Sequence, residues 1–197
     1  MELDPRGAEV EVENRAIHQK VDVASNRAAR KWSGLQLLRR FVWESVRGPL
    51  FAMSPRPLWR WRQVLLRLFG ARIGSHVHIF PSARIAIPWN LEIGNYASIG
   101  DGVILYNLGQ ISIGERATVS QYAHLCAGTH DYTDPTMPLL KKPIRIEADA
   151  WVCADAFVGP GVTIGRGAIL GARAVAVSDV HQFEVAVGNP AMPKRHR

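Results

Sequence analysis

The sequence predicts a mainly β fold, a parallel solenoid of triangular cross-section preceded by an α-helical segment. Two observations carry this prediction: a six-residue repeat from Ile73 to about Ala176, and apolar residues at helical spacing before it. A period of six matches neither the 3.6-residue period of a helix nor the two-residue period of a strand. Hexapeptide periodicity is typical of solenoids whose short strands turn corners and stack on the next coil.

Each repeat consists of an aliphatic residue, a small one, two variable ones, a small one and a variable one. The leading aliphatic residues are Ile73, Ile79, Ile85, Ile93, Ile99, Leu105, Ile113, Val119, Leu125, Ile146, Val152, Val158, Ile164 and Leu170. Matching positions lie 20 residues apart from Ile73 to Ile93 and 18 apart from Ile146 to Ile164, so three repeats form one coil. We expect the leading residues to point inward and stack. The small second and fifth residues suit corners, where glycine tolerates a positive φ.

The repeat is interrupted once, directly after His130. Ile113 and Ile146 lie 33 residues apart instead of 18, which leaves an excursion of 15 residues at about 131–145. Long irregular insertions in regular folds tend to be functional or mobile. We therefore predict a β-helix domain over residues 73–190 with a functional loop at 131–145, and a basic C-terminal tail over 191–197.

Residues 26–72 are predicted to be α-helical. Apolar residues recur at helical spacing in two stretches, which contain Leu35, Leu38, Val42 and Val46, and then Leu58, Trp61, Leu65, Leu68 and Phe69. Three prolines, Pro49, Pro55 and Pro57, separate the stretches, and Gly70 marks a stop before the solenoid.

This helical segment also carries the net charge of +7. Residues 25–72 hold eleven basic residues against one acid, Glu44, whereas residues 73–197 hold ten of each sign. Two roles remain open for the segment: a cap over the end of the solenoid, or an amphipathic anchor on an anionic membrane surface. Nucleic acid is not an expected partner, because no basic groove extends over the fold. Residues 1–25 are predicted to be a disordered tail.

The two cysteines, Cys126 and Cys153, provide no disulfide framework and fall on different faces of the predicted coils. The N-terminus is acidic and lacks the apolar core of a secretory signal. No apolar run reaches the ~20 residues that a transmembrane helix needs. We predict a cytoplasmic location, with peripheral contact to the inner face of the membrane left open.

His130 is the predicted catalytic residue. It ends a repeat and opens the excursion, so the rigid coil holds it on one side and the loop on the other. A histidine placed in this way suits a general base near neutral pH. Asp131 or Asp134 is expected to fix its tautomer and orientation.

The chain resembles the left-handed β-helix acyltransferases, the hexapeptide-repeat family, and most closely the sugar O-acetyltransferases of exopolysaccharide and colanic-acid-type biosynthesis. The stretches that carry the resemblance are Leu68-Phe69-Gly70-Ala71, Pro88-Trp89-Asn90, Gly128-Thr129-His130-Asp131-Tyr132, Ala150-Trp151-Val152, Gly159-Pro160-Gly161-Val162-Thr163-Ile164-Gly165 and Gly188-Asn189-Pro190-Ala191. The resemblance spans residues 35–193. It implies a homotrimer with active sites between neighbouring prisms, acetyl-CoA as the acetyl donor, and a saccharide acceptor attacked directly with His130 as base.

The resemblance also implies roles for further residues. Trp151 lines the thiol end of the coenzyme tunnel, and the Ala154 N–H supports the developing oxyanion. Backbone groups of Gly171 and Ala172 contact the pantetheine arm. Where relatives carry basic residues for the coenzyme phosphates, this chain has Ser178 and Met192, and we expect replacements nearby. The expected replacements are Lys194 and Arg195, and the expected acceptor contacts are Asn107, Asp131 and Tyr132.

Two other functions remain open. A zinc enzyme of the γ-carbonic-anhydrase type has the same fold, but His124 and His130 fall on adjacent faces, and His76 and His78 alternate sides of one strand. A three-histidine site does not follow from these spacings, so no metal is expected. A scaffold solenoid without catalysis is the non-enzymatic alternative. Acetyl-CoA binding separates it from the enzyme.

Overall fold

The computed structural model describes residues 20–197. The tail predicted over residues 1–25 therefore lies mostly outside the described residues. The last part of it is already ordered, because helix α2 (Val23–Ala28) begins at residue 23. The Asp22 carboxylate accepts the Ser25 N–H at 3.0 Å and caps this helix.

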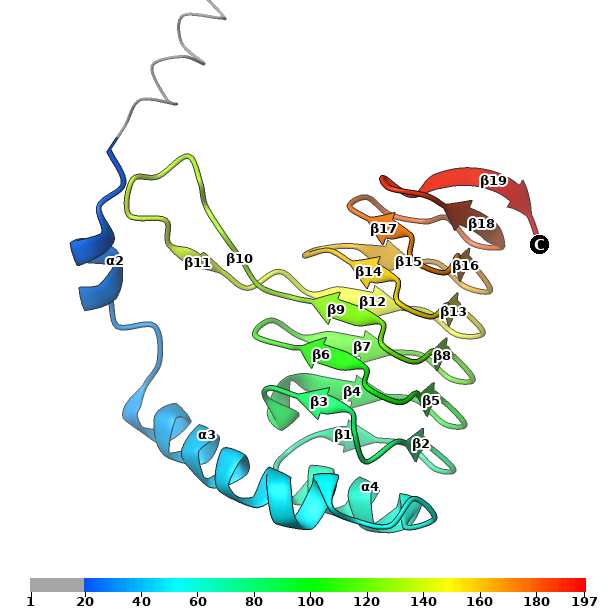
Figure 1. The fold of residues 1–197 in the computed structure, drawn as a ribbon, viewed down its shortest axis with the longest axis horizontal. Helices are drawn as coiled ribbons and strands as arrows, with labels where there is room; N and C mark the ends of the chain where they lie inside the picture. The colour runs from blue at the N-terminus through cyan, green and yellow to red at the C-terminus, as the bar shows by residue number, and fades with distance from the viewer. Residues whose placement is uncertain (1–19) are drawn as a thin grey trace, which may run out of the picture.

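The rest of the chain is a parallel β solenoid with helices at its first end (Figure 1). Its first face contains β1 (Arg72–Ile73), β4 (Leu91–Ile93), β7 (Ile111–Ile113), β12 (Ile144–Ile146) and β15 (Thr163–Ile164). Its second face contains β2 (His78–Ile79), β5 (Ser98–Ile99), β8 (Thr118–Val119), β13 (Trp151–Val152), β16 (Ile169–Leu170) and β18 (Glu184–Val187). Its third face contains β3 (Arg84–Ile85), β6 (Ile104–Tyr106), β9 (His124–Cys126), β14 (Phe157–Val158) and β17 (Val175–Ala176). The solenoid prediction is confirmed, while left-handed winding stays a prediction.

The strand register follows the phase of the hexapeptide. On the first face, Ile73 pairs with Ile93 and Ile93 with Ile113, in steps of 20 residues. Ile113 then pairs with Ile146 across the excursion. All fourteen leading residues are at most 8% exposed and form one core. Burial of each such side chain stabilises the fold by about 1.5–3 kcal/mol, so the repeat and the core are the same set of residues.

The corners differ in detail from the expectation. Positive φ angles fall at the fourth place of the repeat, as in Tyr96 (φ 59°) and Arg116 (φ 56°), rather than at the small second and fifth places. The second-place glycines are required for a different reason. A Cβ on Gly114 would lie 2.5 Å from the backbone nitrogen of Ala148 in the next coil. Close stacking of coils, rather than a left-handed conformation, therefore demands glycine there.

Helices cover the β1 end of the solenoid (Figure 1). They are α3 (Gly34–Val46), the π-helix η1 (Arg47–Ala52) and α4 (Trp59–Leu68), while the short 3-10 turn η2 (Pro88–Asn90) lies within the coils. The two apolar stretches predicted in this segment are helical. Ser33 begins α3 with a capping box that includes Gln36.

No coil precedes the first one, so several carbonyl groups of the first coil have no backbone partner. Side chains of the helices donate hydrogen bonds to these carbonyls. Nε1 of Trp43 donates to Ile85 O at 2.8 Å on the third face. The Arg62 Nε donates to Ile79 O at 2.6 Å on the second. On the first face, the Arg67 guanidinium donates to Ile73 O at 2.8 and 3.0 Å. Gln63 Nε2 donates to Val77 O, directly before β2, at 2.6 Å. Because unpaired strand edges invite further pairing, these side chains close the end of the fold.

Two predicted boundaries are wrong. The excursion ends before residue 144, because β12 already pairs with β7 from Ile144. Strand β10 (Thr129–His130), just before the excursion, and β11 (Leu139–Leu140), within it, form an antiparallel hairpin. The predicted C-terminal tail is instead strand β19 (Met192–His196), which pairs antiparallel with β18 and covers the edge of the last coil.

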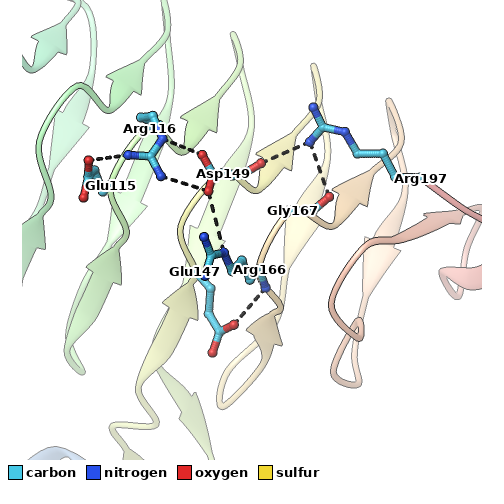
Figure 2. Close-up of polar contacts among 7 residues, drawn as sticks. All are labelled: Glu115, Arg116, Glu147, Asp149, Arg166, Gly167 and Arg197. Carbon is cyan, nitrogen blue, oxygen red and sulfur yellow. Dashed lines mark hydrogen bonds and ion pairs between the residues drawn. The ribbon is translucent and has the colours of Figure 1, made fainter.

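An ion-pair ladder follows the corner between the first and second faces (Figure 2). Arg116 contacts Asp149 in the next coil through Nε at 2.6 Å and Nη2 at 3.0 Å. Arg166, one coil further, lies 3.8 Å from the same carboxylate. The Arg197 guanidinium donates to the carbonyls of Asp149 and Gly167, at 3.3 and 3.4 Å. The ladder therefore links three coils and the C-terminus.

Candidate active site

The hairpin β10–β11 presents His130, which pairs across the hairpin with Leu139. Its turn is held by two Asp-x-Thr segments. The Asp131 carboxylate accepts Thr133 N–H at 3.0 Å and the Thr133 hydroxyl at 2.6 Å. Asp134 accepts the N–H and hydroxyl of Thr136, both at 2.7 Å. Such local side-chain bonds define tight turns, so the sequence of the excursion specifies its own shape.

Neither carboxylate orients His130, so that expectation does not hold. The hydrogen bonds from Thr133 lower the pKa of Asp131 and commit it to the turn. The imidazole instead places Nδ1 2.6 Å from the carbonyl oxygen of Met137. A carbonyl only accepts, so Nδ1 carries a proton, and in the neutral ring the free lone pair is on Nε2. This is the tautomer that a general base requires.

The predicted donor-side residues lie on the second face and at its corner. Trp151 begins β13, is 46% exposed, and donates its Nε1 hydrogen to the Ser120 hydroxyl at 2.8 Å. Val152 pairs with Leu170, so Ala154 and Ala172 occupy the same corner position in successive coils. Within residues 20–197 neither alanine N–H donates a hydrogen bond. The corner therefore offers a column of free amide donors.

Gly171 belongs to this corner but its amide is engaged. Its N–H donates to Ala186 O at 2.8 Å, so among the predicted pantetheine contacts only Ala172 keeps a free amide. Lys194 and Arg195 lie in the exposed strand β19, beside a register shift of its pairing with β18. In the described part of the chain, neither forms an ion pair.

Asn107 does not line an open site, and its predicted contact with the acceptor does not hold. Its side chain is fully buried: Oδ1 accepts Ile87 N–H at 2.9 Å and Nδ2 donates to Ile87 O at 2.5 Å. It is a structural asparagine that joins two coils. Tyr132, by contrast, is 87% exposed at the hairpin, where a partner or substrate could meet it.

The histidine and the tryptophan are separated within one chain. Figure 1 shows β10 projecting from one side of the prism and β13 lying on the other. The His130 side chain is exposed in the single chain. His130 and Trp151 therefore do not meet within one chain.

The zinc alternative gains no support from the histidines. The His124 ring packs edge-on against Phe157, with 5.4 Å between ring centroids, on the third face. Burial lowers the pKa of His124, and its Nε2 has no hydrogen-bond partner in the described residues. Among residues 20–197, no three His, Cys, Asp or Glu side chains gather as a metal site. Burial raises the pKa of the Cys153 thiol, which disfavours the thiolate that covalent catalysis needs.

The molecule is thus a parallel solenoid that carries a histidine held by a backbone carbonyl and, on its second face, corner amides without a partner among the described residues. The chain is 46% identical over 156 residues to a protein of Escherichia coli K12 named as the colanic acid biosynthesis acetyltransferase WcaF, covering 79% of this chain and 86% of that one. The chain therefore belongs to the hexapeptide-repeat acetyltransferase family. No protein-family model matches it.

Two solved structures agree in fold. A maltose O-acetyltransferase from Clostridium difficile 630 superposes with a TM-score of 0.75 at 21% identity, covering 83% of this chain and 89% of that one. The hexapeptide-repeat acetyltransferase VCA0836 from Vibrio cholerae, solved with acetyl-CoA, superposes with a TM-score of 0.76 at 21% identity, covering 85% and 91%. At this identity the likeness concerns the fold alone.

Sequence reasoning missed three groups near His130 and Trp151. The Met137 carbonyl could not be found from the sequence, because every residue has a backbone carbonyl. Ser120, the partner of Trp151, lies 31 residues away and becomes visible only through coil stacking. Asn26 donates to Met137 O at 2.8 Å from a segment that we expected to be a boundary between tail and helix.

Proposed function

We propose that the protein transfers the acetyl group of acetyl-CoA to a sugar hydroxyl in exopolysaccharide biosynthesis, with His130 as general base. The contact between Nδ1 and Met137 O carries this proposal, because it leaves Nε2 as the proton acceptor. Nε2 takes the hydroxyl proton while the oxygen attacks the thioester carbonyl. The tetrahedral intermediate collapses, the C–S bond breaks, and the coenzyme thiolate recovers the proton from the imidazolium. The products are an acetyl ester and free coenzyme A.

Free backbone amides support the donor half of this mechanism. The Ala154 N–H donates to the carbonyl oxygen as it gains negative charge, and one preorganised donor of this kind is worth about 10²–10³ in rate. The Ala172 N–H, one coil further, suits an amide carbonyl of the pantetheine arm. Neither donor is used elsewhere among the described residues.

We further propose a homotrimer in which His130 of one chain meets Trp151 and Ala154 of its neighbour. The support is the separation of β10 and β13 on opposite sides of one prism (Figure 1). A head-to-tail contact repeated three times closes a ring and completes three sites. Mixing inactive His130→Ala and Trp151→Ala chains under subunit exchange should restore activity, because hybrid interfaces contain one intact site. Mixtures that stay inactive would contradict the shared site.

Substitution of the base tests the reaction. We expect His130→Ala to lower kcat by about 10²–10⁴ with acetyl-CoA affinity retained. The matched control is His181→Ala, which removes an exposed histidine from the last coil. An unchanged kcat for His130→Ala would remove this residue from the mechanism. If saturating acetyl-CoA produces neither a thermal shift nor a calorimetric signal, the protein is a scaffold rather than an enzyme.

The outer surface of the cap supports a place of action at an anionic membrane. Eleven large apolar residues between positions 35 and 68 are 41–79% exposed: Leu35, Leu37, Leu38, Phe41, Val42, Leu50, Met53, Leu58, Trp61, Val64 and Leu68. On α3 they lie opposite the buried Trp43 and on α4 opposite the buried Leu66, so both rows face away from the solenoid. No helix among residues 20–197 is long and apolar enough to cross a membrane.

The basic residues beside this face support an anionic surface as its partner. Arg60 lies beside the apolar row of α4, and Arg39 and Arg40 lie beside that of α3. The guanidinium groups of Arg39 and Arg40 also stack on the Trp89 and Trp32 rings, at 4.3 and 4.5 Å from the ring centres. An apolar helix face with basic flanks suits the headgroup region of anionic lipid. We therefore propose peripheral binding through this outer face.

Flotation with vesicles of phosphatidylglycerol and phosphatidylcholine tests this surface. We expect binding that weakens with salt, is absent on pure phosphatidylcholine, and falls at least about tenfold in the Leu38→Ser/Phe41→Ser variant, since each lost side chain removes about 1.5–3 kcal/mol of burial. Tyr122→Ser, at an exposed aromatic residue on the solenoid, is the control. Absence of binding by the parent chain would refute the proposal. A change of oligomer mass in the double variant would make the face an interface between copies instead.

A further inference from the structure

Helix α2 and the hairpin that carries His130 form the two walls of a cleft. The Asp22 N–H donates to Pro135 O at 2.8 Å. Asn26 Nδ2 donates to the carbonyls of Thr136 and Met137, at 2.5 and 2.8 Å. These bonds join residues more than 100 positions apart in the chain. The helix therefore packs on the hairpin, as Figure 1 shows.

The space between them has a volume of about 480 Å³ and a strongly cationic lining. Arg30, Lys31 and Lys141 contribute three positive charges, and the lining includes no acidic residue. Asn26 Oδ1 accepts from the Lys31 ammonium at 2.8 Å. The Lys141 ammonium lies 3.8 Å from the centre of the Trp32 ring. The two lysines are thus held in place by neutral partners and keep their charge for a ligand.

The cleft adjoins the proposed base. Leu139, which lines the cleft, is the residue that pairs with His130 across the hairpin. Thr136, also in the lining, precedes Met137, whose carbonyl holds the imidazole. A ligand in the cleft therefore lies one strand away from the reacting position.

We propose that this cleft binds the phosphate groups of a phosphorylated saccharide acceptor and directs its sugar towards His130. Three cations suit a diphosphate, which lysine and arginine bind through charge-assisted hydrogen bonds. The diphosphate can belong to a nucleotide-linked or to a polyprenyl-linked sugar, because both present the same group. The proposal rests on the proposed sugar acetylation, but its binding step is measurable without turnover.

Calorimetry with inorganic pyrophosphate tests the binding step directly. We expect the full chain to bind pyrophosphate, with an affinity at least tenfold lower in Lys31→Gln/Lys141→Gln. The control is Lys142→Gln, which removes one lysine charge next to the cleft but outside its lining. It should change the affinity for pyrophosphate by less than threefold. Equal binding by both variants, or no binding by the parent, would overturn the proposal. Pyrophosphate binding without any acetyl transfer would leave the cleft in place and reject the proposed function instead.

Kinetics then identify the source of the diphosphate. Acceptors linked to a nucleoside diphosphate and to a short polyprenyl diphosphate are compared with the free sugar. The double variant should raise KM at least tenfold for the diphosphate-linked substrate that the enzyme uses, with the KM for acetyl-CoA unchanged. A free sugar that is acetylated as efficiently as both linked acceptors would contradict the proposal.

The hydrogen bonds of Asn26 carry a second inference independently of the charges. Met137 O accepts from both Asn26 Nδ2 and His130 Nδ1. We infer that Asn26 is a positioning residue that fixes this carbonyl and, through it, the imidazole. Asn26→Ala should lower kcat with KM for acetyl-CoA retained, whereas Arg27→Ala on the same helix should not. Asn26→Asp places a carboxylate near the imidazole and should move the acid limb of the pH–rate profile to higher pH. Profiles identical to the parent in both Asn26 variants would refute the role.

Discussion

Arg62 provides a direct test of how the cap stabilises the solenoid. Its side chain is fully buried without an acidic partner and donates to Ile79 O at 2.6 Å, Ser54 Oγ at 2.8 Å, Pro55 O at 2.9 Å and Arg56 O at 2.6 Å. Arg62→Met keeps much of the apolar stem and removes all four donors. We expect the loss to concentrate in the first coil, because coils contact only their neighbours.

The expected loss of stability follows from two acceptors that lose their donor. Ile79 O is left buried and unpaired, whereas the Ser54 hydroxyl still donates to Phe51 O at 2.6 Å. At about 1–3 kcal/mol for each acceptor, the substitution lowers the free energy of unfolding by about 2–6 kcal/mol. Burial also lowers the pKa of Arg62, which reflects a desolvation penalty that the substitution relieves. The net loss should therefore lie near the lower end, at about 2–4 kcal/mol.

Native-state hydrogen exchange measures this loss locally. The informative amides are those of Gly74, His78 and Arg84, which join the first coil to the second. Since 1.4 kcal/mol is a factor of ten, their protection should fall by about 30- to 700-fold. Arg60→Met, at an exposed position of the same helix, should leave it unchanged. Equal protection in both variants would refute the view that cap donors stabilise the open edge.

Three further predictions concern the coils. Gly114→Ala should lower stability by about 1–3 kcal/mol in a thermal melt, because its Cβ would overlap the next coil; Gly34→Ala, with open space around it, is the control. Hydrogen bonding to Arg116 lowers the pKa of Asp149. The stabilisation that the Asp149 carboxylate gives to the fold is therefore complete above the ordinary carboxyl pKa of 3.8. It is lost as pH falls from 3.8 through the lowered pKa. Asp149→Asn should therefore lower the stability of the protein at pH 7 and lower it less at pH 3, and a difference that does not change with pH would contradict this. Burial raises the pKa of Cys153, so iodoacetamide at pH 7.5 should label it much more slowly than in urea, and equal rates would be the contrary result.

The core and the coil geometry were predictable because they depend on a period. The step of 20 residues between Ile73 and Ile93 and the 18-residue step after Ile146 both appear unchanged as strand register. Register in a parallel stack is fixed by which side chains must point inward. A period in the sequence therefore translates directly into the positions of inward-facing residues.

The polar groups of the site were less predictable because they depend on the backbone. Asn107 sits in a turn, and its sequence position does not distinguish a substrate contact from its bonds to Ile87. The acids beside His130 bind the nearest threonines, since a local bond closes a much shorter loop than a distant one. The His130 imidazole instead contacts the backbone carbonyl of Met137, a group that every residue has.

The stacking of coils also fixes the distance of the histidine hairpin from the capped end of the solenoid. Strand β9, which leads into the histidine hairpin, is two coils beyond β3 at the capped end of the third face. Neighbouring strands are about 4.8 Å apart, so the hairpin stands about 10 Å above that end. If the proposed membrane contact holds and the acceptor is lipid-linked, we expect His130 to reach the sugars closest to the lipid. Inserting one further coil before β9 should raise it by about 5 Å and shift acetylation outward along the chain of sugars.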